Sequence, residues 1–326
     1  MKMARKSKLI SKALALLSLT TLISSCSNVN IVEHRYIDFN TELFFQYDGE
    51  KEFADTLVSP LNKLSDLFDT YKEVSKLVNA YSINHANDFL EVDSDLYKIL
   101  SLSDDYFQDT DGLFNVLVKD LSELWKTSIN NNTLPTEEET KVLVDSISSS
   151  SLEFKDGNRV KIKGNAHIDL GAIAKGYALA KVKEQIKKTE ITNYIFNAGF
   201  SSIILGENSE NDGLYRVGIN NSSNKYIEVK NTSIGTSSIY EQGYINTGDK
   251  IYSHIVNPLT GDSCVKHHMV VAIHDDPILT DVYSTVGMIS SLSQIKIFET
   301  ISQVKFITFS DGEVTYSSPD LKVLSR

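Results

Sequence analysis

The order of helical and strand patterns along the chain most constrains its fold. Apolar residues recur at helical spacing between Phe53 and Ala80, although Pro60 interrupts this pattern early. From Asp169 onwards, short runs of alternating apolar residues follow one another, and a helix is expected from about Thr280 to Ser290. The sequence contains no internal repeat and no long linker. This mixed order predicts the α+β class, as one compact unit of mixed sheets flanked by helices.

The remaining elements follow from the same patterns. A polar segment at 130–139 reads as a loop. Further helices are expected at 96–102, 114–125 and about 174–188, and strands at 36–47, 160–168, 194–197, 202–205, 215–219, 226–229, 251–256, 269–274, 305–309 and 314–316.

The N-terminus has the pattern of an export signal. A basic head precedes an apolar run from Ala13 to Ile23, which is too short to span a bilayer. Small residues then lead to Cys26, which predicts a bacterial lipoprotein signal cleaved before that residue. An ordinary signal peptide or a buried N-terminal helix are the alternatives. We therefore expect a signal peptide at 1–25, a lipidated Cys26 and tether at 26–35, and a domain at 36–326 held on the extracytoplasmic face of the bacterial cell membrane.

Composition limits the partners of the chain. The formal net charge of −11 argues against a nucleic-acid partner. Cys264 is the other of the 2 cysteines. With Cys26 lipidated, the chain cannot form an internal disulfide.

One candidate metal site lies at the start of the helix near residue 280. Thr280 is expected to cap this helix, which would place Asp281 in its first turn. Asp281 and Thr285 are four residues apart and therefore share a face. A carboxylate and a hydroxyl are hard oxygen ligands that suit Mg²⁺ or Ca²⁺. The simpler interpretation is that Asp281 only stabilises the helix N-terminus.

A second candidate is the turn from Asp169 to Tyr177, which is rich in Gly and Ala. A strand is expected to run into Asp169 and a helix to leave near Ala174. Small residues let the backbone approach a ligand, and a helix N-terminus with Lys175 beside it suits a phosphate group. The alternative is a tight strand-to-helix turn in which Asp169 acts only as a cap.

A third candidate is His254, on an expected strand just before the Asn257-Pro258 and Thr260-Gly261 turn signals. A histidine at a strand end can serve as a general base. A single strand histidine is more often structural.

The order of the motifs resembles one family. DLGAIAKGYAL, FNAG, YRVGI, GTSSIYEQ, HIVNPLTG and LTDVYST follow one another from Asp169 to Thr285. FNTELF, FDTYKEVSKLVNA and TDGLFNVLVKDLSELW fit more loosely in the N-terminal half. This series resembles the ApbE family, the FAD:protein FMN transferases, over about residues 36–326, and implies an ApbE-like (T-fold-like) domain.

The resemblance implies a reaction and a set of site residues. FAD would be cleaved at its pyrophosphate, FMN would pass to a Thr or Ser hydroxyl of an exported acceptor protein, and AMP would leave. His254 would take the acceptor proton. Mg²⁺, with Ca²⁺ or Mn²⁺ as alternatives, would be bound by Ala172 (backbone carbonyl), Asp281, Ser284 and Thr285, and FAD would be contacted by Tyr71, Leu113, Phe114, Asn115, Asp169, Lys175 and Ile255.

The sequence also departs from the family pattern. Phe200 and Ser201 stand where the family usually has Gly and Asp, and Ser238 where it usually has Gly. Asn115 and Asn257 stand where it usually has Asp. Two other functions therefore remain open: an FAD pyrophosphatase, in which water replaces the acceptor, and an FAD-binding lipoprotein without catalysis. A solute-binding lipoprotein is opposed by the lack of alternating β-α units.

Overall fold

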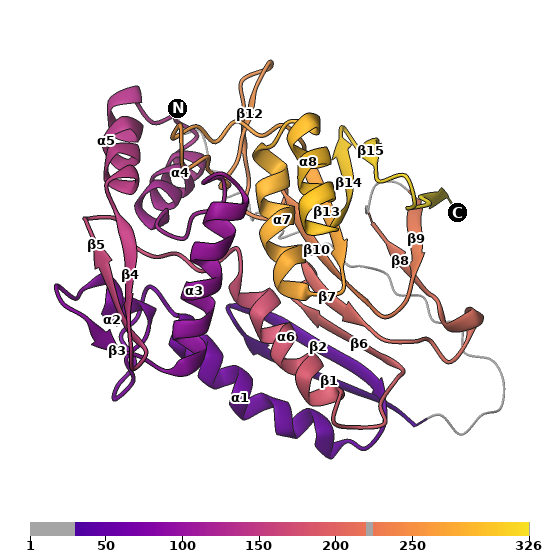
Figure 1. The fold of residues 1–326 in the computed structure, drawn as a ribbon. Helices are drawn as coiled ribbons and strands as arrows, with labels where there is room; N and C mark the ends of the chain where they lie inside the picture. The colour runs from indigo at the N-terminus through magenta and orange to yellow at the C-terminus, as the bar shows by residue number, and fades with distance from the viewer. Residues whose placement is uncertain (1–29, 220–223, 326) are drawn as a thin grey trace, which may run out of the picture.

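The computed structural model describes residues 30–219 and 224–325 (Figure 1). The expected signal peptide and Cys26 lie outside these residues. Within the described ranges, no helix combines the length and apolar character needed to cross a membrane. The helices are α1 (Glu52–Phe68), α2 (Ala80–Asn84), α3 (Ser94–Asp109), α4 (Lys119–Asn131), α5 (Glu137–Ser148), α6 (Ala174–Ile186), α7 (Pro277–Ile289) and α8 (Leu292–Ser302), and the strands are β1 (Ile31–Asp38), β2 (Thr41–Asp48), β3 (Leu90–Glu91), β4 (Ser151–Lys155), β5 (Arg159–Lys163), β6 (Tyr194–Ala198), β7 (Ser202–Leu205), β8 (Tyr215–Gly218), β9 (Lys225–Val229), β10 (Thr232–Ser238), β11 (Ile245–Asn246), β12 (Ile251–Tyr252), β13 (Met269–His274), β14 (Lys305–Ser310), β15 (Glu313–Ser317) and β16 (Leu324–Ser325).

An 8-stranded sheet forms the centre of the molecule, in the order β1-β2-β6-β7-β10-β13-β14-β15. Each neighbouring pair in it is antiparallel. The predicted α+β class is confirmed, but the central sheet is antiparallel and not of mixed strand direction. The antiparallel order also excludes the alternating β-α architecture of solute-binding lipoproteins.

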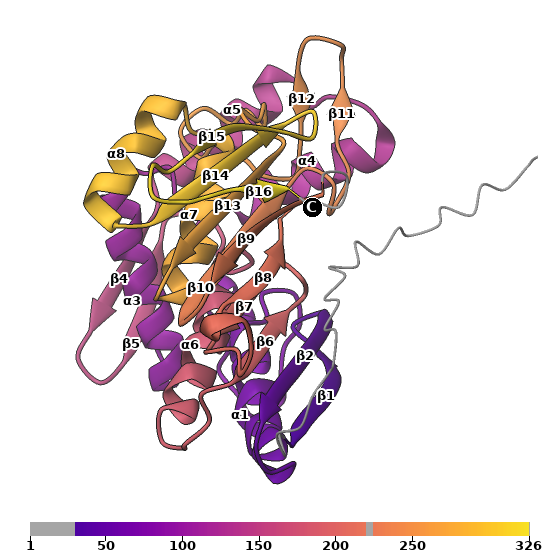
Figure 2. The ribbon, with the colours of Figure 1, turned by 90° about the vertical axis from the view of Figure 1, so that its right-hand side faces the viewer.

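Both faces of the central sheet are covered. Helices α6 and α7 lie on one face, and the 3-stranded sheet β16-β9-β8 lies on the other (Figures 1 and 2). Strand β13 is covered on both of its faces, since its residues from Met269 to Ile273 are all buried. Val270 and Ala272 belong to the core beneath the helices, whereas Met269, Val271 and Ile273 belong to the second apolar cluster. A strand that is buried on both faces reads as a continuous apolar run.

Helix α4 is fixed to the loop that follows β12. The Trp125 indole N–H donates a hydrogen bond of 2.9 Å to the Gly261 carbonyl. Its ring stacks on Tyr252, with 5.5 Å between the ring centroids. Trp125 is 4% exposed, so this contact is part of the core. It joins the N-terminal helical part of the chain to the segment that carries His254.

Several predicted boundaries were wrong. The strand expected at 36–47 is a hairpin of β1 and β2, so the expected tether at 26–35 runs into β1 at Ile31. Strand β1 lies at a sheet edge and alternates exposed with half-buried residues, which makes it read as polar. The helix expected from Phe53 to Ala80 ends at Phe68, and Asn79 caps a separate helix, α2. Helices α5 and α8 and strand β10 were not predicted.

Two glycines allow α7 to lie unusually close to its neighbours. A Cβ atom at Gly235 in β10 would lie 2.2 Å from the Thr280 carbonyl oxygen. A Cβ atom at Gly176 in α6 would lie 2.4 Å from the Pro277 carbonyl oxygen. Both obstacles are backbone atoms, which cannot rotate away. These glycines therefore set the position of α7 relative to the sheet and to α6.

We expect Gly235→Ala to lower the free energy of unfolding by about 1–3 kcal/mol, because α7 must move away from the sheet. Gly218→Ala is the matched control, since a Cβ atom at that strand residue meets nothing within 4 Å. Urea unfolding of both variants measures the difference. Equal stability of the two variants would contradict the close approach of α7 to β10.

Candidate active site

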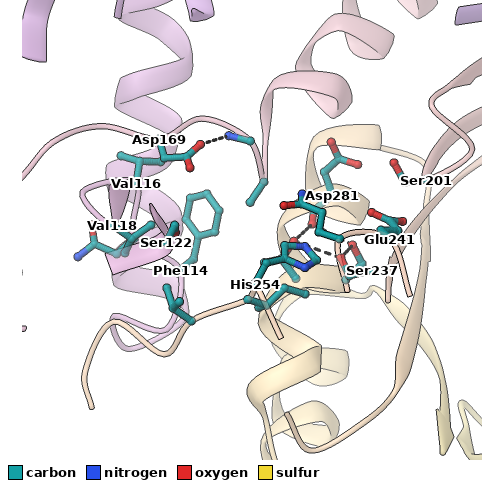
Figure 3. A pocket seen from close by; sticks show the side chains of 18 of the residues that line it. Phe114, Val116, Val118, Ser122, Asp169, Ser201, Ser237, Glu241, His254 and Asp281 are labelled. Atoms are coloured by element: carbon teal, nitrogen blue, oxygen red, sulfur yellow. Dashed lines mark hydrogen bonds between the residues drawn. The ribbon is translucent and has the colours of Figure 1, made fainter. Parts of the chain in front are cut away.

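A pocket of about 990 Å³, part of it open to solvent, lies where α4, α6, α7 and β10 meet the loop after β12. Figure 3 shows Asp169 and Ser122 toward the α4 side, and Asp281, Ser237 and Glu241 on the opposite side. The predicted site residues that line this pocket are Leu113, Phe114, Asn115, Asp169, Ala172, Lys175, His254, Ile255, Asp281, Ser284 and Thr285.

Asp281 is held by two groups from distant parts of the chain. Its Oδ2 accepts a hydrogen bond of 2.6 Å from the Gly176 backbone N–H. Its Oδ1 accepts one of 2.5 Å from the Ser202 hydroxyl. The residue is 5% exposed. The carboxylate therefore joins α7 to the start of α6 and to β7.

The position of Asp281 in its helix differs from the prediction. Helix α7 begins at Pro277, and the Asp276 carboxylate caps it by accepting from the Ile278 N–H. Asp281 consequently lies in the second turn, and Thr280 is not the cap. Pro at the first helical position with Asp before it is a strong start signal. Asp281 is thus not needed to cap α7, and its burial calls for another explanation.

Burial raises the pKa of the Asp281 carboxyl above its ordinary value. The positive charge of Lys175 and the hydrogen bonds from Ser202 and Gly176 act in the opposite direction. A buried carboxylate is costly unless such partners, or a cation, stabilise its charge. The site is therefore built to favour a positive group next to Asp281.

Hydroxyl groups from β10 and α7 line the same pocket as this carboxylate. The Ser237 hydroxyl lies 3.0 Å from the Ser284 hydroxyl and 3.3 Å from that of Thr285. The Ser284 and Thr285 hydroxyls both donate to the Asp281 carbonyl, at 3.0 and 3.2 Å. Each oxygen keeps a lone pair that a cation could use.

These oxygens suit a hard divalent cation. Ala172, Asp281, Ser284 and Thr285 line the same pocket, and carboxylate, hydroxyl and carbonyl oxygens are the ligands that Mg²⁺ and Ca²⁺ prefer. In the described part of the chain, no group of three or more His, Cys, Asp or Glu residues is placed to hold a metal ion. The predicted ligand set contains a single carboxylate, so it does not depend on such a group.

The turn before α6 is only partly as predicted. Asp169 Oδ1 accepts from the Gly171 N–H at 2.8 Å, which confirms the tight turn. The strand before it ends at Lys163, earlier than expected. The Gly176 N–H in the first turn of α6 donates to the Asp281 carboxylate.

His254 lies in the loop after β12, because the strand expected to reach Val256 ends at Tyr252. Burial, together with the positive charges of Lys126 and Lys175, lowers the pKa of His254 to about 4. Its Nδ1 atom is buried and has no hydrogen-bond partner among the described residues. No carboxylate therefore stabilises the imidazolium ion, and the ring is neutral near pH 7.

Tyr71 is the one predicted FAD-contacting residue outside the pocket lining. It is 55% exposed, and the Lys119 ammonium lies 4.2 Å from its ring centroid. Partial burial and the negative charge of Asp169 raise the pKa of its phenol. Tyr71 is thus close to Asp169, at the edge of the site.

Sequence reasoning missed several polar groups of the pocket. Ser202 binds Asp281 directly, and Ser122, Lys126 and Glu241 line the cavity. Burial raises the pKa of Glu241, with Lys175 opposing this effect and Asp281 adding to it. Glu241 and Ser237 belong to the quoted motif GTSSIYEQ and could have been selected from it. Ser202 and Lys126 belong to no sequence pattern that indicates a site, because only the fold brings them to the pocket.

The family model described as "ApbE family" matches residues 32–307. The chain belongs to the ApbE family. A relative named FAD:protein FMN transferase from Buchnera aphidicola subsp. Schizaphis graminum is 25% identical over 222 residues, 64% of each chain. A relative of the same name from Klebsiella pneumoniae is 21% identical and aligns over 84% of this chain and 87% of its own length. The aligned region thus spans slightly less than two thirds of the Buchnera relative.

The fold comparison agrees with the family. The crystal structure of the ApbE protein from Thermotoga maritima is similar over 88% of this chain and 97% of that chain, with a TM-score of 0.74 and 23% identity. The ApbE-like fold predicted from the motifs is thereby confirmed.

We predict that His254 titrates with a midpoint near pH 4, because burial and two nearby ammonium groups disfavour its charged form. Histidine resonances followed by NMR across the acid range measure this midpoint, and the signal lost in His254→Ala assigns it. Lys175→Met should raise the midpoint by removing a positive charge. A midpoint at or above the ordinary 6.5 of histidine would contradict the described surroundings of the ring.

Proposed function

We propose that this ApbE family member is an FAD:protein FMN transferase that depends on a divalent cation, in the first place Mg²⁺. The observation that carries the proposal is the buried Asp281 carboxylate, which shares one pocket with Ser284, Thr285, Ala172, Lys175 and a neutral His254. The relatives named for this activity support it.

The proposed reaction exchanges the phosphoanhydride bond of FAD for a phosphoester bond to the acceptor. An acceptor Thr or Ser oxygen forms a bond to the FMN phosphorus of FAD, the bond from that phosphorus to the bridging oxygen breaks, and AMP leaves with that oxygen. Such reactions depend on positioning and on charge stabilisation more than on covalent chemistry by the protein. A cation bound by Ala172, Asp281, Ser284 and Thr285 would neutralise phosphate charge.

The protein's own groups have distinct roles in this proposal. Lys175 binds the phosphates through its charge, and Asp169 and the segment from Leu113 to Asn115 hold the dinucleotide. His254, neutral before FAD binds, accepts the proton of the acceptor hydroxyl. Tyr71 and Ile255 contact the flavin nucleotide at the edge and within the pocket.

We also propose that the protein is anchored by a lipid on Cys26 and acts on an exported acceptor protein at the extracytoplasmic face of the cell membrane. The basic head, short apolar run and small residues before Cys26 support this proposal. The domain would begin soon after the anchor, since β1 starts at Ile31.

Incubation with FAD, Mg²⁺ and an acceptor domain tests the proposed reaction. We expect covalent flavin fluorescence on the acceptor and release of AMP, and we expect Asp281→Asn, which keeps the shape of the side chain, to abolish both. Asp145→Asn, an exposed carboxylate on α5, is the matched control. AMP release without labelling would indicate a pyrophosphatase, FAD binding with neither product would indicate a carrier, and unchanged turnover in Asp281→Asn would remove the metal assignment.

His254→Ala separates binding from chemistry. We expect FAD binding to be retained and transfer to slow by about 10²–10⁴-fold, the usual contribution of a general base. Single-turnover transfer and FAD titration measure the two effects, with His85→Ala on the exposed surface as the control. Loss of FAD binding without a selective effect on the rate would contradict the base role.

A further inference from the structure

One face of α4 forms a wall of the pocket. Val118, Ser122 and Lys126 follow one another at intervals of four residues, so they lie on the same side of the helix, and all three line the cavity. The neighbouring Trp125 fixes this helix by its hydrogen bond to Gly261. The position of Lys126 is therefore set by the core and not by a mobile loop.

The Lys126 ammonium lies in the pocket without a close partner. Its Nζ is 3.8 Å from Asp169 Oδ2, and the side chain is 33% exposed. Among the described residues Nζ makes no hydrogen bond, and the Asp169 carboxylate already accepts one from Gly171. An ammonium group has three donors, so Lys126 can bind a further anion.

Lys175 faces the pocket from α6 in a similar state. Within the described chain it has neither an ion pair within 4.0 Å nor a side-chain hydrogen bond, although its charge acts on Asp281 and Glu241. The acidic neighbour of Lys126, by contrast, is Asp169. The two lysines thus present free donors from different helices, and both act on the His254 ring.

The charge of the pocket favours a second cationic side chain for an anionic substrate. Besides Asp281, which is assigned to the proposed cation, Asp169 and Glu241 line the cavity, and their negative charges oppose phosphate groups. FAD contains a diphosphate, so two anionic groups must enter this acidic pocket. A second ammonium group, on the α4 side, offsets this repulsion.

We propose that Lys126 is a second diphosphate-binding residue, which holds the phosphates of FAD from the α4 side while Lys175 holds them from the α6 side. This inference rests on the proposed function. Lys126 makes the pocket selective for phosphorylated flavins, because riboflavin has no phosphate group for the ammonium to bind.

Equilibrium binding followed by flavin fluorescence tests the proposal with FAD and riboflavin as probes. For Lys126→Gln we expect FAD binding to weaken about tenfold to a hundredfold, the effect of losing a hydrogen bond to a charged group, with riboflavin binding unchanged. Lys126→Arg should restore most of the FAD affinity. Lys141→Gln, which removes an exposed lysine on α5, is the matched control and should bind like the original protein.

Three outcomes would count against the inference or its basis. FAD affinity unchanged in Lys126→Gln would overturn it. Equal loss of FAD and riboflavin binding would also overturn it, since Lys126 would then only support Asp169 and the pocket wall. No FAD binding by the original protein would instead reject the proposed function, which keeps the two failures distinguishable.

Discussion

The buried carboxylate of Asp281 is the interaction on which the rest of the site depends. Its two hydrogen bonds, from the Gly176 N–H and the Ser202 hydroxyl, join α7, α6 and β7 at one point. Glycine is required at position 176 because a Cβ atom there would strike the Pro277 carbonyl oxygen. A charge this well buried is stable only with compensation from partners. The sheet and two helices are thus arranged around one negative charge.

The pocket follows from this arrangement. The sheet face beneath α6 and α7 supplies Ser237, and α7 supplies Ser284 and Thr285, so the oxygens gather at one wall. Helix α4 forms another wall, fixed by Trp125 to the loop that carries His254. The acidic wall and the neutral histidine therefore face the same space. In the proposed reaction, the oxygen wall would hold the cation that neutralises phosphate charge, and the neutral histidine would accept the proton of the acceptor hydroxyl.

Local sequence signals predicted the elements whose structure depends on a few neighbouring residues. The fully apolar run of β13 and the Gly/Ala turn before α6 were placed well, since burial and turn chemistry act over a few residues. The start of α7 was misplaced, although Asp276-Pro277 is a regular start signal. Ser202 was missed altogether, because its role comes from an antiparallel pairing that sets β7 beneath α7. Packing between segments that are distant in the sequence is not indicated by the residues next to Ser202.

Two departures from the family pattern lie at turns in which a side-chain oxygen accepts a backbone hydrogen bond. The Asn115 side-chain oxygen accepts from the Leu117 N–H at 2.8 Å, and that of Asn257 accepts from the Leu259 N–H at 2.9 Å. An aspartate would make the same turn-stabilising hydrogen bond, so both replacements preserve the backbone that shapes the pocket. Asp281 differs from them, since it is buried and hydrogen-bonded by groups from two other elements. Asparagine therefore preserves the backbone at the two turns, whereas the proposed cation site needs the carboxylate of Asp281.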